Sequence, residues 1–250
     1  MLGSGTSTGV PVVGCDCAVC RSPDARNRRL RPALWLELAG GGSVLIDTPP
    51  DLREQALRAG LRRVDAVLYT HAHADHIFGL DDLRPFNFRQ NGTIPCFASA
   101  ATLDRLRQVF SYVVEETQEG GGKPRLELHA VRSPFALLDE EILPIPAWHG
   151  ELEVYGYRCR RFAYLTDVNR IPEASWPLLA GLDVLILSAL RYRPHPTHFS
   201  LAEAVATALR IGARRTIFTH LAHDVDHGAL REPLPPGIEL GYDGLVVELD

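Results

Sequence analysis

Four side chains that can bind a metal ion lie close together in this 250-residue chain. They are His71, His73, Asp75 and His76, and they directly follow the strand-like run Asp65–Thr70. Imidazole and carboxylate ligands together suit Zn²⁺, iron and Mn²⁺. Because alternate residues leaving a strand point the same way, we expect His71 and His73 to share one ion and Asp75 and His76 to turn to a second. A solvated polar turn is the alternative, but it does not account for four ligands with apolar flanks.

This segment resembles the HxHxDH signature of the metallo-β-lactamase-fold superfamily of binuclear hydrolases, and other residues match the superfamily's remaining elements in order. The resemblance implies that one ion is held by His71, His73 and His149, the other by Asp75, His76 and His220, and both by Asp167. It also implies that Asp47 is a buried carboxylate that braces the metal-binding loop, and we expect Asp75 to be catalytic as well as a ligand. Two such ions lower the pKa of a bridging water, so that a hydroxide is available to attack phosphorus.

Strand-like and helical patterns alternate along the whole chain, which predicts a layered α/β or α+β fold in one domain, residues 1–250. The expected strands are Ala33–Leu38, Ser43–Asp47, Asp65–Thr70, Ile94–Ser99, Val154–Arg158, Phe162–Thr166, Asp183–Ser188, Arg214–Thr219 and Leu245–Leu249. The expected helices are Asp51–Ala59, Thr102–Phe110 and Ser200–Ile211, with Asp51 and Ser200 as N-caps, and Glu119–Pro124 is expected to be a flexible loop. The resemblance, which covers nearly the whole chain, implies an αββα sandwich of two mixed sheets with outer helices.

Three cysteines, Cys15, Cys17 and Cys20, lie too close together in sequence to pair comfortably as disulfides. Three thiolates at this spacing suit three corners of a tetrahedral zinc site, and His223 is the candidate fourth ligand. The arrangement is similar to the Cys₃His structural zinc of the phosphodiesterase of the carbon–phosphorus lyase pathway. The coenzyme-PQQ biosynthesis protein has such a cluster too, but commonly departs from the full active-site ligand set. Free thiols in a loop are the alternative.

Other positions narrow the branch of the superfamily. A carboxylate at Asp167 argues against lactamases that have cysteine there, and no His-x-Glu-x-Asp motif of the diiron oxidoreductases is present. The opening segment Gly3–Pro11 resembles the N-terminal glycine loop of the phosphodiesterase branch, which includes RNase Z, although a plain turn explains it equally well. Only Met1 and Leu2 precede this loop where a strand is expected, which leaves open a start site assigned too late or a trimmed edge.

We expect His198 to protonate the leaving oxygen, as a histidine at this place does in the phosphodiesterase branch. A surface histidine that caps a helix is the alternative, and His195 reads as a loop residue between two prolines. Arginine binds phosphate with two hydrogen bonds, so Arg84, Arg191 and Arg193 are the candidate substrate contacts, with surface ion pairs as the alternative.

Composition limits the remaining classes. A hydrophobic fraction of 46%, a charged fraction of 23% and no long apolar run predict a cytoplasmic protein without a membrane span. The net charge of −5 argues against broad nucleic-acid binding. The resemblance implies a binuclear phosphodiesterase with two divalent ions (zinc, manganese or iron) and one structural zinc, and we expect it to act on a small cyclic or nucleotide-like diester of the phosphoribosyl cyclic phosphate type. An RNase Z-like nuclease, a non-catalytic metal-binding accessory protein and a thioesterase of the glyoxalase II kind are the alternatives. The sequence leaves open whether the chain forms a homodimer.

Overall fold

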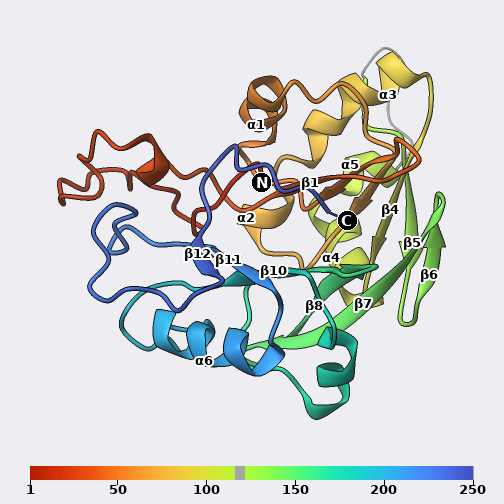
Figure 1. Cartoon of the computed structure of the whole chain (residues 1–250). Coiled ribbons are helices and arrows are strands. Elements are labelled where there is room, and N and C mark those ends of the chain that lie inside the picture. Colours follow the sequence, from red (N-terminus) through yellow and green to blue (C-terminus); the bar gives the residue numbers. More distant parts are fainter. Residues whose placement is uncertain (116–121, 250) are drawn as a thin grey trace.

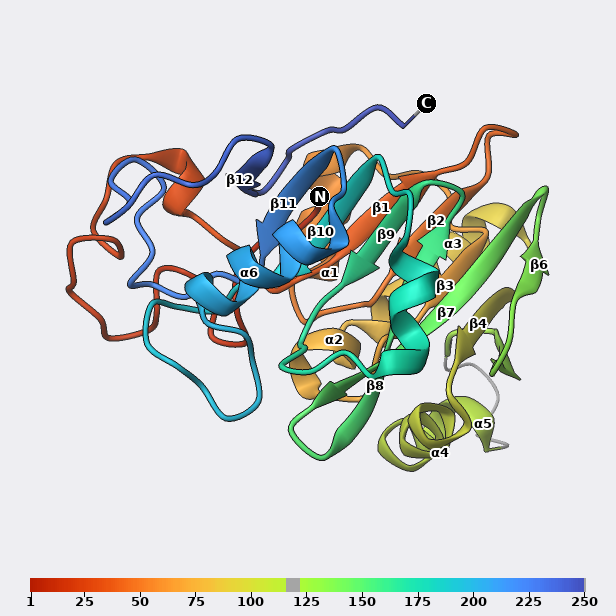
Figure 2. The ribbon, with the colours of Figure 1, turned by 60° about the horizontal axis from the view of Figure 1, so that its bottom comes forward.

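Two β-sheets pack face to face and helices cover their outer faces (Figures 1 and 2) in the computed structural model, which describes residues 1–115 and 122–249. The strands are β1 (Leu34–Glu37), β2 (Ser43–Ile46), β3 (Ala66–Leu68), β4 (Ile94–Ala98), β5 (Leu126–Ala130), β6 (Phe135–Leu137), β7 (Glu140–His149), β8 (Leu152–Cys159), β9 (Phe162–Leu165), β10 (Val184–Ser188), β11 (Arg215–Thr219) and β12 (Ile238–Leu240). The α-helices are α1 (Leu52–Ala59), α2 (Ala74–Ile77), α3 (Arg84–Gln90), α4 (Ala100–Val109), α5 (Ser111–Val114) and α6 (Leu201–Ile211). Short 3₁₀ helices span Ala25–Asn27, Leu80–Leu83 and Glu173–Leu179.

Both sheets are mixed. The first has the order β1-β2-β3-β4-β5, in which β1 is antiparallel to β2 and the other pairs are parallel. The second has the order β12-β11-β10-β9-β8-β7-β6, parallel from β12 to β9 and antiparallel from β9 to β6. This arrangement confirms the αββα sandwich that the sequence resemblance implies.

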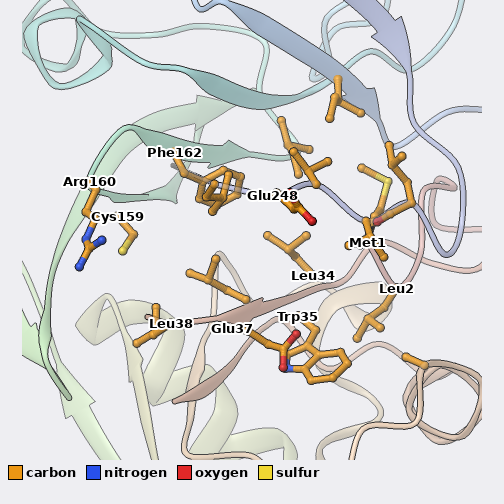
Figure 3. A pocket seen from close by; sticks show the side chains of 18 of the residues that line it. Met1, Leu2, Leu34, Trp35, Glu37, Leu38, Cys159, Arg160, Phe162 and Glu248 are labelled. Carbon is orange, nitrogen blue, oxygen red and sulfur yellow. Dashed lines mark hydrogen bonds between the residues drawn. The ribbon is translucent and has the colours of Figure 1, made fainter. Parts of the chain in front are cut away.

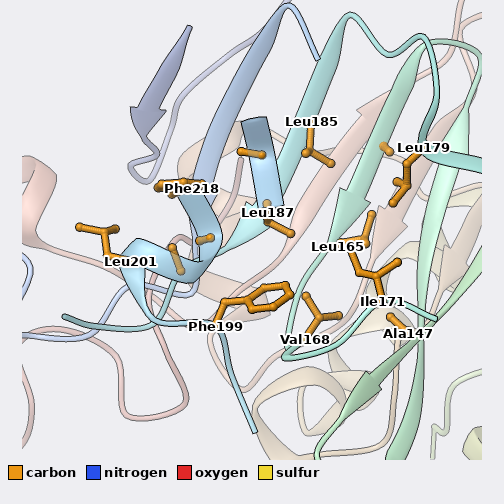
Figure 4. Close-up of a cluster of buried hydrophobic side chains, with 14 of the residues drawn as sticks. Ala147, Leu165, Val168, Ile171, Leu179, Leu185, Leu187, Phe199, Leu201 and Phe218 are labelled. Atoms are coloured by element: carbon orange, nitrogen blue, oxygen red, sulfur yellow. The ribbon is translucent and has the colours of Figure 1, made fainter. Parts of the chain in front are cut away.

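Successive side chains of a strand point to opposite faces of its sheet, so the strands contribute to three apolar layers. In β2, Val44 and Ile46 face the layer between the sheets, whereas Leu45 faces the layer beneath α1 and α4. In β10, Ile186 faces the layer between the sheets, whereas Leu185 and Leu187 pack against α6 (Figure 4). Because both faces of these strands are buried, they read as continuous apolar runs, which is typical of parallel strands covered on both sides.

Helix α6 begins where the predicted N-cap places it. The Ser200 hydroxyl accepts from the backbone N–H of Glu203, and the Glu203 carboxylate accepts from the backbone N–H of Ser200. This reciprocal cap fixes the start of α6 two residues after His198. Asp51 also precedes a helix, but its carboxylate accepts from the backbone and guanidinium of Arg31 and makes no capping bond.

The sequence prediction is wrong for one strand and misses four. Residues 245–249, which the structure describes, form no strand: Leu245 packs into the layer between the sheets, but the segment pairs with no neighbour. The missed strands are β5, β6, β7 and β12.

Strand β7 contains Pro144 and Pro146, which have no N–H group to donate. Strand β6 pairs only with Glu140–Ile142 of β7, so both prolines lie beyond the part of this edge that is paired. The expected loop Glu119–Pro124 lies within the described residues only from 122 onward.

A cavity of about 800 Å³ opens beside β1 and the chain's C-terminal segment (Figure 3). Its lining includes Trp35, Phe162 and the apolar residues of 244–249, and Met1 lies at one end, where its amino group donates to the carbonyl of Leu245 at 2.7 Å. No residue of the predicted metal site is among its described lining residues. Within the described ranges, no helix has the length and apolarity needed to cross a bilayer.

Candidate metal centre

The predicted ligands converge because each follows or ends a strand. Asp47 follows β2, His71 comes three residues after β3, His149 ends β7, Asp167 lies two residues after β9, and His220 follows β11. The carboxyl ends of parallel strands meet at one edge of a sheet, where open α/β proteins place their sites. Residues far apart in the sequence are therefore brought to one place.

Three of these strand ends have backbone in the left-handed region, which costs a residue other than glycine of order 1–3 kcal/mol. The φ angles are 64° at Asp47, 53° at Asp167 and 60° at His220. Such angles persist only where the surrounding structure holds them. Here they mark the points at which the chain turns a carboxylate or an imidazole away from its strand.

Two groups of potential ligand atoms result, each with its atoms within 4.8 Å of one another. The first group is His71, His73, His149 and Asp167, and the second is Asp75, His76, Asp167 and His220. Asp167 belongs to both. Its Oδ2 lies 3.9 Å from Nε2 of both His71 and His149, whereas its Oδ1 lies 3.4 Å from Nε2 of His76 and 3.1 Å from Nε2 of His220. The two oxygens of one carboxylate thus face different groups.

The side chains at this site fit divalent ions. The Nε2 atoms of His71, His76 and His220 are buried and have no hydrogen-bond partner among the described residues. Each such orphan costs roughly 1–3 kcal/mol unless something else binds it. Burial lowers the pKa of His71 well below its usual value, so its ring is neutral and able to bind a metal. Burial would raise the pKa of Asp167, but His220 and His76 hold it well below the usual range, so it is a carboxylate.

Hydrogen bonds at Nδ1 orient the imidazole rings of His76 and His149. The fully buried carboxylate of Asp47 accepts from the backbone N–H and the hydroxyl of Thr70, both at 2.8 Å, and from Nδ1 of His76 at 2.7 Å. Nδ1 of His149 donates in the same way to the carbonyl of Thr197 at 2.6 Å. With Nδ1 holding the proton, Nε2 of each ring is left free for an ion, which is the usual arrangement behind metal-binding histidines.

We expect Asp47→Asn to weaken metal binding at this site by about 10–100-fold while the fold is retained. The amide is the same size as the carboxylate, but its NH₂ group would face N–H and O–H donors of Thr70 and His76 that now bond Asp47. The hydrogen bond that orients the ring of His76 would then be lost. Titration of the loaded protein with a competing chelator measures the effect. Asp104→Asn, an exposed carboxylate on α4, is the matched control. Equal metal retention in both variants would contradict the bracing role of Asp47.

A third group joins the cysteine cluster to His223. Nδ1 of His223 lies 3.3 Å from Sγ of Cys15, 3.4 Å from that of Cys17 and 3.6 Å from that of Cys20. The backbone N–H of Cys20 lowers the pKa of the Cys17 thiol to about 6, whereas burial raises that of Cys20 to about 11. Three sulfurs and one imidazole nitrogen are a donor set that suits tetrahedral zinc.

The loop that carries His223 is fastened by a buried cation. The side chain of Arg29 is 1% exposed, and its guanidinium donates to the carbonyls of Ala222 and Val225 at 2.9 and 2.7 Å and to the side chain of Asn27. These carbonyls flank His223 on both sides. Because His220 precedes the same loop, Arg29 also steadies the segment between the two candidate metal sites.

We expect Cys17→Ser to remove one equivalent of zinc and to lower the melting temperature, because metal binding at such a site contributes to folding free energy. Metal analysis of the purified protein and a thermal melt measure the two effects. Cys96→Ser is a poor control because that thiol is fully buried, so Ser22→Ala in the same loop serves instead. Unchanged zinc content in Cys17→Ser would rule out this cysteine as a ligand.

The glycine loop lies beside the second group of ligands. Thr6 donates its backbone N–H to Leu221, and Leu221 donates to Ser4, so the loop pairs with the residue that follows His220. A Cβ atom at Gly5 would lie 2.8 Å from the Arg29 side chain and carbonyl, so no larger residue fits there. The carboxylate of Asp243 holds the loop from its other side by accepting from Ser4.

The structure places His198 at the site. Its Nδ1 is buried, has no hydrogen-bond partner among the described residues and lies 3.9 Å from Oδ2 of Asp167. Its ring stacks on that of His220 at 4.8 Å and lies 4.4 Å from that of His149. Burial, reinforced by His220, lowers the pKa of His198 to about 3.

Two of the three predicted substrate arginines, Arg84 and Arg191, have side-chain contacts outside the candidate metal site. Arg84 donates to the carbonyl of Gly122 and lies 3.6 Å from Asp81, and none of its described contacts is with a metal-ligand residue. Arg191 donates to the carbonyls of Arg193 and Pro194 within its own loop. Arg84 thus makes the surface contacts that were the alternative to substrate binding. A substrate contact from Arg191 or Arg193 stays a prediction.

Several residues that shape the site are absent from the sequence predictions. A threonine directly precedes three ligands: Thr70 contacts Nδ1 of His71 at 3.0 Å, and Thr166 donates to Oδ1 of Asp167 at 2.7 Å. Thr219 precedes His220 in the same way. A threonine directly before a candidate ligand is therefore a pattern that could have been found in the sequence. Hydrogen bonds of Asn169 and Thr197 join the turn at His149 to the loop before His198. No comparable sequence pattern marks these two residues.

Comparisons with known proteins agree with this geometry. The Beta-lactamase superfamily domain matches residues 43–221. The octanoyltransferase of Porphyromonas gingivalis is 40% identical over 254 residues, covering all of this chain and 51% of that protein, so the chain spans about half of that relative's length. Coenzyme PQQ synthesis protein B of Methylobacterium nodulans is 25% identical over 305 residues, covering all of this chain and 99% of that protein.

A solved structure agrees over nearly its full length. The crystal structure of a new diphosphatase from the PhnP family superposes with a TM-score of 0.92 at 47% identity, and the match covers all of this chain and 96% of that one. Both the matched domain and this relative confirm the resemblance that the HxHxDH motif indicates. The chain belongs to the metallo-β-lactamase superfamily, in which it lies close to the PhnP family.

Proposed function

We propose that this protein is a binuclear metal-dependent phosphodiesterase that acts on small cyclic or nucleotide-like phosphoric diesters. The observation that carries the proposal is the carboxylate of Asp167, whose two oxygens face the Nε2 atoms of two separate groups of imidazoles. That arrangement suits two ions that share one ligand. Ions bound there would supply Lewis acidity toward phosphoryl oxygens and lower the pKa of an attacking water.

The chain's own residues then have distinct tasks. Asp47 and Thr197 hold His76 and His149 with Nε2 toward the site. The ring of His198 lies beside Asp167, and the negative charge of a bound phosphoric ester would favour its imidazolium form, which is placed to donate a proton to the departing oxygen as charge develops on it. A poor leaving group becomes a strong base as its bond to phosphorus breaks, so it draws the proton from the ring.

A diphosphate linkage is a second candidate substrate, because the relative that is 47% identical is a diphosphatase. Both candidates require hydrolysis at a phosphorus with two substituted oxygens, each bonded to carbon or to a second phosphorus, and the same donor groups serve either. A panel of diesters, cyclic ribose phosphates and nucleotides with a diphosphate bridge distinguishes them by kcat/KM.

The test is hydrolysis of bis-p-nitrophenyl phosphate by protein loaded with Zn²⁺, Mn²⁺ or Fe²⁺. Turnover with at least one of these ions is expected. No turnover with any of them, together with hydrolysis of a thioester, would favour the glyoxalase II kind of activity. Bound metal without turnover on either would favour a non-catalytic accessory protein, and a salt-dependent shift with tRNA would favour a nuclease.

A further inference from the structure

The loop that leads to His198 is held unusually firmly for a surface connection. Arg191 donates its guanidinium to the carbonyls of Arg193 and Pro194, at 3.2 and 3.1 Å. On the other side of His195, the amide of Asn169 donates to the carbonyl of Pro196 at 2.8 Å. Two prolines also fix the backbone φ angle on either side of His195. The position of this histidine is therefore set by contacts rather than left to solvent.

The ring of His195 has one determined tautomer. Its Nδ1 accepts from the backbone N–H of Thr197 at 3.3 Å and lies 3.2 Å from the Thr197 hydroxyl. Because a backbone N–H can only donate, Nδ1 carries no proton, and the neutral ring holds its proton on Nε2. Burial and the nearby Arg191 lower the pKa of His195, in agreement with a neutral ring. None of the hydrogen bonds among the described residues uses Nε2.

The ring of His195 lies next to that of His198. The ring of His195 is 5.1 Å from that of His198, which is itself 4.4 Å from the ring of His149. His198 is buried and His195 is half-buried, so His195 lies on the solvent side of the pair. Thr197 bonds both His195 and His149: its backbone N–H donates to Nδ1 of His195, and its carbonyl accepts from Nδ1 of His149.

We propose that His195 is a substrate-contacting residue that donates Nε2–H to a phosphoryl oxygen of the bound ester or of the phosphate product. The proposal rests on the phosphodiesterase function proposed above, and it assigns a specific anion contact within that site. A neutral donor suits this position because it binds an anionic oxygen without adding a further positive charge beside the metal ions. Because His195 is half-buried and its Nε2 bonds no described residue, this N–H is available to a ligand that enters beside His198.

The experiment compares His195→Phe, His195→Gln and the wild type, each loaded with the same metal. Phenylalanine keeps the ring but has no donor, whereas the glutamine amide places an N–H near the position of the imidazole Nε2. His129→Ala is the control, because His129 is an exposed histidine on β5 of the other sheet. The readouts are metal content, the affinity for inorganic phosphate by calorimetry, and KM and kcat for bis-p-nitrophenyl phosphate.

We expect His195→Phe to bind phosphate about tenfold more weakly and to show a similar rise in KM, because a hydrogen bond to a charged group is lost. Metal content is expected to be unchanged, and His195→Gln is expected to recover most of the affinity. Equal phosphate affinity in wild type and His195→Phe would overturn the inference. So would loss of metal in His195→Phe, or a wild type that binds no phosphate. If the phosphate effect appears but no diester is hydrolysed, the anion contact stands and the proposed function fails.

Discussion

Asp167→Ala is expected to abolish hydrolysis of bis-p-nitrophenyl phosphate, with a fall in kcat/KM of at least about 10³-fold. Asp167 is the residue that both candidate ligand groups share, and its oxygens lie within 3.9 Å of an imidazole nitrogen from each of four other ligands in these groups. Removing it deprives both groups of a ligand at once. It also removes the carboxylate that would offset the positive charge of ions bound beside His71, His76 and His220.

Metal analysis separates this prediction from simple misfolding. We expect Asp167→Ala to lose metal from the histidine-rich groups but to keep the ion held by Cys15, Cys17, Cys20 and His223, which shares no residue with them. Retention of that ion reports a folded chain, because its ligands come from both ends of the sequence. Asp104→Asn is again the matched control for removal of a carboxylate. A variant with wild-type metal content and wild-type turnover would exclude the shared-ligand role.

The sequence predicts which candidate ligands converge better than it predicts the sheets. His71, His73, Asp75 and His76 are adjacent in sequence, so their types and spacing alone predict a site, and the resemblance supplies His149, Asp167 and His220. Strands with both faces buried, such as β2 and β10, are also predicted correctly, because continuous apolar runs are visible without knowing their partners. A local pattern is sufficient in each of these cases.

What the sequence does not predict depends on long-range contacts. Strand β5 alternates leucine with polar residues and is half exposed, and it pairs along its length with β4. Residues 245–249 look like a strand, yet the segment forms no ladder with a neighbouring strand, and Leu245 accepts one bond, from the amino group of Met1. The orienting roles of Asn169, Thr197 and Arg29 depend on the fold that brings them to His149 and His223, and nothing in their own sequence neighbourhood indicates those roles.

His198→Ala is expected to reduce the rate in a way that depends on the leaving group. General acid catalysis contributes about 10²–10⁴-fold when the leaving group is a strong base. An alkyl diester should therefore lose about that much in kcat, because its alkoxide departs poorly without a proton. A p-nitrophenyl diester should lose about tenfold or less, because p-nitrophenolate is stable without one. The ratio of the two losses is the informative quantity, since it cancels any general damage to the site.

The position of His198 allows this result to be tied to the proton rather than to metal binding. Its Nδ1 lies 3.9 Å from Asp167, but the ring belongs to neither candidate ligand group. We therefore expect His198→Ala to keep its full metal content, in contrast to Asp167→Ala. His198→Gln, which retains a hydrogen-bond donor but cannot carry the extra proton of an imidazolium, should lose nearly as much rate on the alkyl diester as the alanine variant. Equal losses on the alkyl and p-nitrophenyl diesters would refute the acid role, because a side chain that only positions the phosphate slows both substrates alike.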